Sequence, residues 1–270
     1  MLGFALTDRV IVQRLTDFLW VGIDSALSRS HVDRVAGVFS ALKNSLGELK
    51  SYYMNHDIGS AQPALPAPTR YFPSITTYPC KDGHQQVKFK YIGYLESGFD
   101  CVTLRAQTES AQDIVVKFVE RYSESAHHTL AEANLAPRLL HYGPLQWSPQ
   151  RPGGSLYMVA MEYIDGDTLA SAKSTMNEDM VKRVKSDLKR ALTLLHEKDL
   201  VFGDLRPPNV MITKEGKRVK LIDFDWAGVA GQVEYPHLLS PAVTWPKGVQ
   251  TLDPIKKEHD LEMLDNLFAT

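Results

Sequence analysis

Hydrophobic and polar residues change their spacing near residue 85 of the chain. Before this point, apolar side chains recur at steps of three and four positions, which is the period of one helix face. We therefore predict that residues 7–55 are helical. The apolar stripe consists of Val35, Phe39, Leu42, Leu46, Leu49 and Tyr53. It is too short to indicate a coiled coil, so packing on the same protein is favoured over a dimer seam.

A proline-rich segment follows this helical region. Residues 57–79, DIGSAQPALPAPTRYFPSITTYP, contain five prolines, and proline interrupts both helices and central strands. We therefore predict a linker over residues 57–82. It separates a helical N-terminal extension, residues 1–56, from a second domain, residues 83–270.

Beyond the linker the pattern becomes that of strands. Alternating apolar positions with many β-branched residues are typical of neighbouring antiparallel strands. The predicted strands are QVKFKYIGYL (86–95), CVTLRAQ (101–107), DIVVKFVE (113–120), RLLHYGPL (138–145) and LYMVAMEYI (156–164). A helix is predicted in SESAHHTLAEANLA, which ends before Pro137. The region therefore indicates a five-stranded antiparallel sheet with one inserted helix.

The rest of the chain combines helices with a short hairpin. The segment EDMVKRVKSDLKRALTLLHEKDL, residues 178–200, has its apolar residues on one helical face. VMIT and RVKLIDF are predicted to form a hairpin around the turn KEGK. A last helix is predicted in DPIKKEHDLEMLDNLF, residues 253–268. This half is therefore mainly helical.

Composition narrows the classes of partner. The formal net charge of −2 gives no reason to expect nucleic acid or an anionic membrane. Cys80 and Cys101 have no C-x-x-C spacing, so a disulfide framework or zinc site is not predicted and a reducing compartment is favoured. Charged residues interrupt the first twenty positions, which is not typical of a signal peptide. We expect a cytoplasmic or nuclear protein with no membrane or nucleic-acid partner.

Two segments carry the candidate chemistry. In VFGDLRPPNVMI, Asp204 follows an apolar run, and Asn209 comes after two prolines that prevent a regular helix. In LIDFDWAG, Asp223 ends another apolar run. Two strands that each deliver a carboxylate to the same end indicate a metal or phosphate site. The alternatives are that these side chains only cap turns, or that Asp204 and Asp223 serve an unrelated metal hydrolase.

Residues 85–270 resemble the protein-kinase-like superfamily. VFGDLRPPNVMI is similar to its catalytic loop, LIDFD to its D-F-G segment, and IVVK to the strand that carries a phosphate-binding lysine. The amino-acid sequence of these segments also resembles that of the kinase-like proteins of mushroom-forming fungi and of the aminoglycoside and choline kinases. The resemblance implies an α+β bilobal fold with a five-stranded N-lobe sheet over residues 83–161. A reduced, mainly helical C-lobe over residues 165–270 would follow.

The resemblance implies that ATP and Mg²⁺ are the cofactors. Asp204 would accept the proton of the acceptor hydroxyl, while Asn209 and Asp223 would hold Mg²⁺ through oxygen atoms. Arg206 would offset charge on the phosphoryl group in transfer. Lys117 would grip the α and β phosphates.

Further positions follow from the same resemblance. Gly98 and Val102 are expected in the loop that covers the phosphates. Met161 would lie behind the adenine, with backbone groups of Glu162 and either Tyr163 or Ile164 facing it.

One charge pair and one backbone anchor are also implied. Glu124 is predicted to pair with Lys117, with Glu132 as the alternative. Asp260 in KEHDLEML resembles the acid that anchors the backbone of the catalytic loop. The sequence departs from protein kinases at Phe202 and Gly203, which replace histidine and arginine, and at Asp225, which replaces the glycine of D-F-G.

The favoured hypothesis is a phosphotransferase that moves the γ-phosphate of ATP to a hydroxyl of a protein (Ser/Thr) or a small molecule. The alternative is a pseudokinase or nucleotide-binding interaction module, with a protein partner docked on the N-terminal helices.

Overall fold

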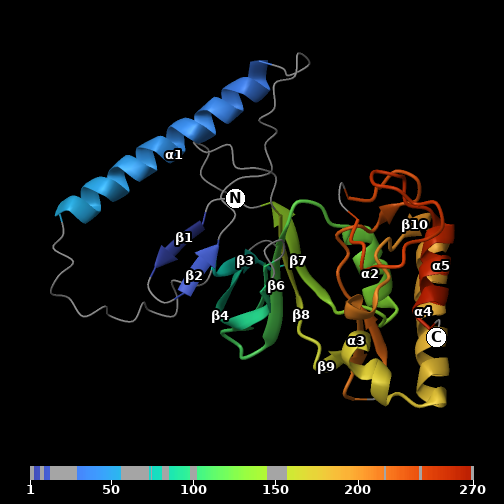
Figure 1. Ribbon diagram of the computed structural model, residues 1–270. Coiled ribbons are helices and arrows are strands. Elements are labelled where there is room, and N and C mark those ends of the chain that lie inside the picture. Colours follow the sequence, from blue (N-terminus) through green and yellow to red (C-terminus); the bar gives the residue numbers. More distant parts are fainter. Residues whose placement is uncertain are drawn as a thin grey trace. The chain divides into compact units, whose positions relative to one another are not determined.

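The computed structural model describes a defined part of the chain. The described residues are 3–6, 9–12, 29–55, 73, 75–80, 85–97, 102–144, 157–215, 217–236 and 239–268. They belong to two compact units, one of residues 1–74 with 152–154 and one of residues 75–151 with 155–270 (Figure 1).

The first unit contains a strand pair and one long helix. Strands β1 (Gly3–Leu6) and β2 (Arg9–Val12) pair antiparallel, and helix α1 spans Arg29–Asn55. Helix α1 confirms the predicted helical conformation for residues 29–55. The helical prediction was wrong for β2, because its sequence RVIV places three β-branched residues in a row, a composition that favours extended backbone.

The second unit contains a six-stranded antiparallel sheet. Its strand order is β3-β4-β5-β6-β8-β7. The strands are β3 (Thr77–Pro79), β4 (Gln86–Ser97), β5 (Val102–Thr108), β6 (Asp113–Val119), β7 (Leu139–Pro144) and β8 (Tyr157–Glu162). Helix α2 (Glu124–Glu132) lies between β6 and β7 in the chain. The five expected strands and the inserted helix are all present.

The predicted strand number of five was one too low. The additional strand β3 lies inside the range expected to be a linker, and it pairs with β4 through Tyr78 and Val87. Because β3 is an edge strand, Pro79 at its end leaves the ladder intact. Tyr78 is only 5% exposed and packs against Phe89. Burial of this aromatic ring explains why a proline-rich segment extends the sheet.

The remaining elements form the mainly helical half (Figure 1). The helices are α3 (Leu169–Ala172), α4 (Glu178–Glu197) and α5 (Lys257–Asn266), with short 3₁₀ turns η2 (Lys173–Thr175) and η3 (Pro207–Asn209). The strands are β9 (Gly166–Thr168), β10 (Leu200–Val201), β11 (Val210–Thr213), β12 (Val219–Leu221) and β13 (Gly228–Val229). The predicted β11–β12 hairpin is confirmed by its antiparallel pairing.

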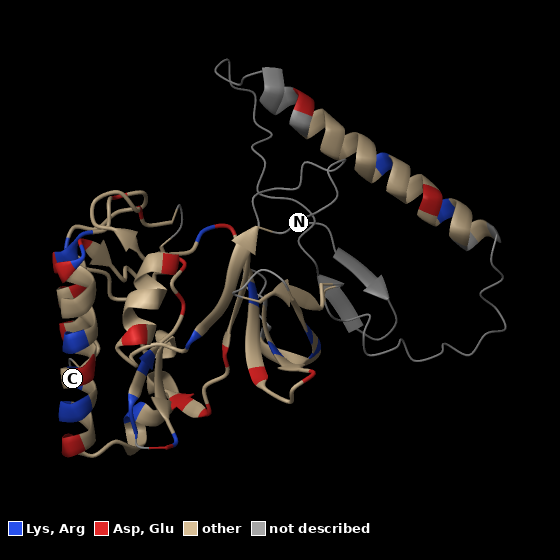
Figure 2. Ribbon diagram, turned by 180° about the vertical axis from the view of Figure 1, so that it is seen from behind, with Lys and Arg blue, Asp and Glu red and all other residues tan. Residues whose placement is uncertain are grey.

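Helix α4 organises the core of this half. Asn177 caps its first turn by accepting a hydrogen bond from the N–H of Met180 at 2.9 Å. The face that carries Val184, Leu188 and Leu195 is buried, which confirms the predicted amphipathic helix. The same core includes residues of α2, β11, β12 and α5. Basic positions (Lys and Arg) and acidic positions (Asp and Glu) alternate along the ribbon of this unit (Figure 2).

No helix in the described part of the chain is long and apolar enough to cross a membrane.

Candidate active site

The loop between β10 and β11 holds Asp204 in a fixed environment. Asp204 is 4% exposed. Arg206 donates from Nη2 to Asp204 Oδ2 at 2.5 Å and from Nε to Asp204 Oδ1. The side-chain amide of Asn209 donates to the backbone oxygen of Asp204 at 2.9 Å and to its Oδ2 at 2.8 Å. Because both bonds use Nδ2, they orient the amide and leave its oxygen as the group directed away from Asp204.

The surroundings of Asp204 favour a carboxylate that takes up a proton. Burial raises its pKa, and the charge of Asp223 acts in the same direction. The hydrogen bonds and charge of Arg206 oppose this effect, but the net pKa of Asp204 is above its ordinary value. A raised pKa makes the carboxylate a better proton acceptor for a substrate hydroxyl.

The backbone just before Asp204 is anchored by Asp260 of α5. Asp260 is fully buried. Its Oδ2 accepts a hydrogen bond from the Phe202 N–H at 2.9 Å, and its Oδ1 accepts one from the Gly203 N–H at 2.8 Å. His196 Nε2 lies 3.0 Å from Oδ2. The predicted role of Asp260 as the anchor of this loop is confirmed.

The segment after β12 carries the second acid. Asp223 has φ +70°, a conformation that costs energy for any residue with a side chain and is common at functional sites. Lys117 of β6 reaches it: Lys117 Nζ lies 2.7 Å from Asp223 Oδ1 and 2.8 Å from Asp225 Oδ2. The N–H of Ile222 donates to the carbonyl of Asn209 at 3.0 Å. This bond joins the Asp223 segment to the Asp204 loop.

Lys117 is an unusual residue for the centre of a sheet. It lies on β6, between β5 and β8, and is 3% exposed. A buried ammonium group requires charged partners, because desolvation is costly. The structure thus brings together Lys117, Asp204, Asn209 and Asp223, the four residues that the sequence analysis assigned to one candidate site.

The two acids beside Lys117 differ in their affinity for protons. Burial tends to raise the pKa of Asp223, but Lys117 holds that pKa below its ordinary value. Burial and the neighbouring charge of Asp223 raise the pKa of Asp225. Asp225 Oδ1 is buried and has no hydrogen-bond partner among the described residues. A second carboxylate with an unsatisfied oxygen is suited to a cation.

The donor set fits Mg²⁺. No three His, Cys, Asp or Glu side chains converge on one point in the described residues. Mg²⁺ takes oxygen ligands and usually binds proteins through one or two carboxylates, with phosphate and water supplying the rest. Asp223 and the amide oxygen of Asn209 would supply the protein ligands, with Asp225 close by.

An aromatic stack connects this segment to α2. The Phe224 ring lies parallel to His127, with centroids 4.5 Å apart and an angle of 7°, and meets Phe202 edge-on at 5.5 Å. His127 Nε2 is 2.7 Å from the carbonyl oxygen of Pro137, which can only accept, and Nδ1 is 2.6 Å from the Tyr122 hydroxyl. Burial lowers the pKa of His127 to about 4. The ring is therefore neutral and donates from Nε2.

The glutamates predicted as partners of Lys117 lie elsewhere. Glu124 is in the first turn of α2, where its side chain is 53% exposed and 3.7 Å from His128 Nε2. Glu132 is exposed at the end of the same helix. The carboxylates recorded at Lys117 come from Asp223 and Asp225.

The positions predicted around the phosphates and adenine are described in part. Gly98 lies outside the described residues, and Val102 begins β5. Met161 is 5% exposed on β8. Glu162 uses its N–H to donate to the Arg138 carbonyl at 2.9 Å.

Ile164 is half-buried in the connection between β8 and β9. The sheet and the helical half are joined by this connection.

Sequence reasoning missed two features of the site. It named Asp225 only as the replacement for the glycine of D-F-G and did not predict its ion pair with Lys117. The acid at this position was the available signal. It also did not predict the stacking of His127 on Phe224, because the sequence does not indicate which side chain a helical histidine will contact.

The structure combines a sheet with a mainly helical half, and an ion pair between the buried Lys117 and Asp223 joins the two beside an Asp–Asn loop. This arrangement is that of kinase-type folds. The protein kinase domain family matches residues 92–244, more than half of the chain. The chain belongs to this family.

Two curated relatives and one solved structure illustrate the similarity. The probable serine/threonine-protein kinase mkcF of Dictyostelium discoideum is 28% identical over 182 residues, which cover 62% of this chain and 26% of the relative. The cAMP-dependent protein kinase type 3 of Saccharomyces cerevisiae is 30% identical over 117 residues, or 42% of this chain and 29% of the relative. The chain thus spans less than a third of the length of either relative. The Cydia pomonella granulovirus kinase PK-1 has a similar fold, with a TM-score of 0.52, 15% identity and 65% coverage of each chain.

Proposed function

We propose that this chain is an ATP- and Mg²⁺-dependent phosphotransferase that moves the γ-phosphate to a hydroxyl group. The observation that carries the proposal is the gathering of Lys117, Asp204, Asn209 and Asp223. The Lys117–Asp223 contact of 2.7 Å joins residues 106 positions apart in the chain. A lysine, a proton acceptor and oxygen ligands for a divalent ion are the parts that phosphoryl transfer needs.

Each residue has a defined task in this proposal. Bound Mg²⁺–ATP supplies the phosphoryl donor and neutralises its developing charge. Lys117 binds phosphate oxygens, and Asp223 and Asn209 hold the ion. As the bond from the acceptor oxygen to the γ-phosphorus forms, the bond to the β-phosphate oxygen breaks and ADP leaves. Asp204 takes the hydroxyl proton, and Arg206 beside it balances negative charge.

The finer relationship that we propose is with kinases of small molecules. Gly203 has φ +80°, and a Cβ at this position would lie 2.9 Å from the carbonyl oxygen of Trp226. The backbone before Asp204 is therefore suited to glycine, as in the H-G-D pattern of aminoglycoside and choline kinases. The sequence around this loop also resembles that of the kinase-like proteins of mushroom-forming fungi. A hydroxyl on a small molecule is thus favoured over a protein serine or threonine.

Replacement of Asp204 by asparagine tests the transfer step. Asp204→Asn keeps the size of the side chain and removes its basicity. We expect ADP formation from Mg²⁺–ATP to fall by about 10²- to 10⁴-fold, the usual contribution of a general base. Asp265→Asn on α5, where the carboxylate is 76% exposed, is the matched acid-to-amide control and should retain full activity.

Thermal stabilisation by nucleotide separates the competing hypotheses. If the native chain and Asp204→Asn form ADP at equal rates and ATP stabilises the native chain, the enzyme hypothesis is wrong. The chain is then a nucleotide-binding interaction module. Stabilisation by Mg²⁺ alone, with no effect of ATP, would favour a metal hydrolase.

The interaction module would need a surface for a protein partner, and helix α1 offers one. Helix α1 has large apolar side chains in solvent, with Phe39 57% exposed and Leu46 50% exposed. An apolar helix face of this kind is suited to a protein partner. Binding to such a partner is compatible with either hypothesis for the second unit.

A further inference from the structure

Helix α1 carries an apolar stripe with the spacing of a coiled-coil seam. Aliphatic and aromatic residues follow one another at alternating steps of three and four positions, so they occupy the a and d positions of a seven-residue repeat. These residues, called the α1 seam below, are Val32, Phe39, Leu46 and Tyr53 at a, and Val35, Leu42 and Leu49 at d. A repeat of 3.5 residues keeps such a stripe against a second helix as the two helices wind around each other.

The described side chains of the α1 seam are open to solvent. Phe39 is 57% exposed and Leu46 is 50% exposed. The d positions Val35, Leu42 and Leu49 are half-buried. None of the hydrophobic core clusters formed by the described residues contains a residue of α1. Packing on the same protein was the expectation from the sequence, but the part of the chain that the structure describes provides no core for this stripe.

The side of α1 away from the seam adds little stability to the helix. Gly37 and Gly47 lie inside the helix, and glycine weakens an isolated helix relative to alanine. A Cβ at either position would meet nothing within 4 Å, so close packing does not require these glycines. In the seven-residue repeat they occupy positions f and b, which face away from the seam. The helix therefore depends mainly on contacts that its seam makes.

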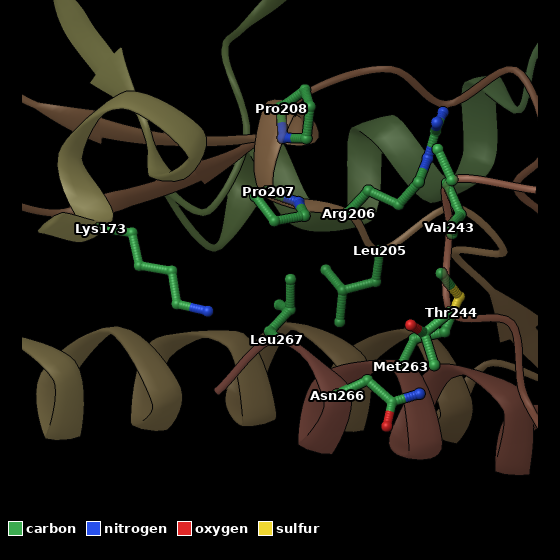
Figure 3. Close-up of a pocket in the computed structure, with 11 residues that line it drawn as sticks. Lys173, Leu205, Arg206, Pro207, Pro208, Val243, Thr244, Met263, Asn266 and Leu267 are labelled. Atoms are coloured by element: carbon green, nitrogen blue, oxygen red, sulfur yellow. The ribbon is translucent and has the colours of Figure 1, made fainter. Parts of the chain in front are cut away.

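The longer helices of the second unit use their apolar faces inside that unit. Residues of α2, α4 and α5 belong to one buried core. Met263 of α5 also lines a pocket of about 340 Å³ together with Leu205 and Pro207 of the catalytic loop (Figure 3). Among the helices that the structure describes, α1 is thus the one that presents a long apolar seam to solvent. A seam of this repeat is matched by an identical helix, which offers the same repeat in return.

We propose that α1 pairs with α1 of a second copy of this chain in a parallel, two-stranded coiled coil. The same surface of both copies then forms the interface around a twofold axis. Each a or d side chain packs into the space between four residues of the facing helix. This packing removes the exposed apolar surface of Phe39 and Leu46 from water, which is the favourable term in the association.

Charges beside the α1 seam favour the parallel orientation. Lys43 and Lys50 are at e positions, and both are exposed. In a parallel pair each of these lysines lies beside a g position of the other helix, and the g positions Val38 and Ser45 carry no charge. An antiparallel pair would place the e positions of both copies on the same flank. The lysines of the two copies would then repel one another.

Sedimentation of the full chain tests the self-association. We expect the native chain to change from monomer to dimer as its concentration rises, with a dimer mass twice the 30.3 kDa of one chain. Leu42→Glu places a charge at the centre of the α1 seam and should raise the dissociation constant of the dimer at least about tenfold. Asn44→Glu makes the same change of charge at an exposed f position and should leave the constant unchanged.

Circular dichroism separates loss of pairing from loss of folding. Because α1 depends on its seam, the helix content of the native chain should fall on dilution through the transition from dimer to monomer. Leu42→Glu should show the lower helix content at every concentration. Thermal unfolding of the second unit should be the same in Leu42→Glu and Asn44→Glu. A melting temperature that is lowered only in Leu42→Glu would place the seam against the second unit and overturn the proposal.

Disulfide formation tests the orientation of the two helices. The background is the chain in which serine replaces Cys80 and Cys101. Val35→Cys in this background should form a covalent dimer on oxidation, because identical d positions face each other in a parallel pair. Asn44→Cys, at the outward f position, is the control and should not form one. Absence of the covalent dimer for Val35→Cys overturns the parallel arrangement.

The remaining outcomes of sedimentation also decide the proposal. A native chain that stays monomeric at every concentration overturns it, and so does an assembly of more than two chains. A dimer that Leu42→Glu does not weaken is held together by another surface and overturns it as well. A dimer that Leu42→Glu weakens, that Asn44→Glu leaves intact and that Val35→Cys links covalently establishes α1 as the interface.

Discussion

Substitution of Asp260 by asparagine tests how the catalytic loop is held. Each carboxylate oxygen of Asp260 accepts one backbone N–H, from Phe202 at 2.9 Å and from Gly203 at 2.8 Å. The side chain is fully buried, so water cannot replace either bond. Asparagine offers one acceptor oxygen and turns its NH₂ group towards the other N–H.

The expected cost follows from this geometry. One charge-assisted hydrogen bond is lost, which is about 1.5–3 kcal/mol, and one buried N–H is left without an acceptor, which costs about 1–3 kcal/mol. Because the two effects overlap, we expect Asp260→Asn to lower the free energy of unfolding by about 3 kcal/mol. The matched change Asp265→Asn, at a carboxylate that is 76% exposed, should stay within about 0.5 kcal/mol of the native chain.

Urea unfolding, followed by circular dichroism, measures both variants. Amide hydrogen exchange at Phe202 and Gly203 reports the loop itself and should accelerate in Asp260→Asn before global unfolding. A difference below about 0.5 kcal/mol between the two variants, with unchanged exchange at these amides, would refute the anchoring role.

Three other changes have expected outcomes. Stability should fall by about 3 kcal/mol from pH 6.5 to pH 4, because burial lowers the pKa of His127 from 6.5 to about 4 and the unfolded chain binds this proton first. His127→Gln should flatten that part of a pH-dependent urea series. Gly203→Ala should cost at least about 1–3 kcal/mol in thermal unfolding, because φ is +80° and Cβ would meet the Trp226 carbonyl; an unchanged melting temperature would contradict this. Asp225→Asn should raise severalfold the Mg²⁺ concentration for half-maximal activity, and an unchanged Mg²⁺ titration would argue against its place near the ion.

The local patterns of the sequence predicted much of the second unit. The amphipathic face of α4 and the β11–β12 hairpin depend on neighbouring residues, whose period is visible in the chain. The acids Asp204 and Asp223 end apolar runs and therefore mark strand ends. By contrast, the helical prediction was wrong at residues 9–12, where three β-branched residues in a row carry too little periodic information to separate helix from strand.

Partners across the fold required the tertiary structure. Lys117 was predicted to bind a glutamate of α2, but Asp223 and Asp225 lie at its ammonium group. A buried lysine requires an acidic partner. Which acid lies within 3 Å of its ammonium group depends on how α2 and the segment after β12 pack. The sixth strand of the sheet likewise depends on burial of Tyr78 against Phe89.

The sequence by itself determined the chemical parts of this protein: a lysine in a strand, an Asp–Asn loop stiffened by prolines, and an acid after a hairpin. These follow from residue type and short-range spacing. The tertiary structure decided which charges meet, and it formed the pocket beside Leu205 from segments far apart in the chain. The physical reason is that pairing and cavity shape depend on close packing of side chains, which no local pattern encodes.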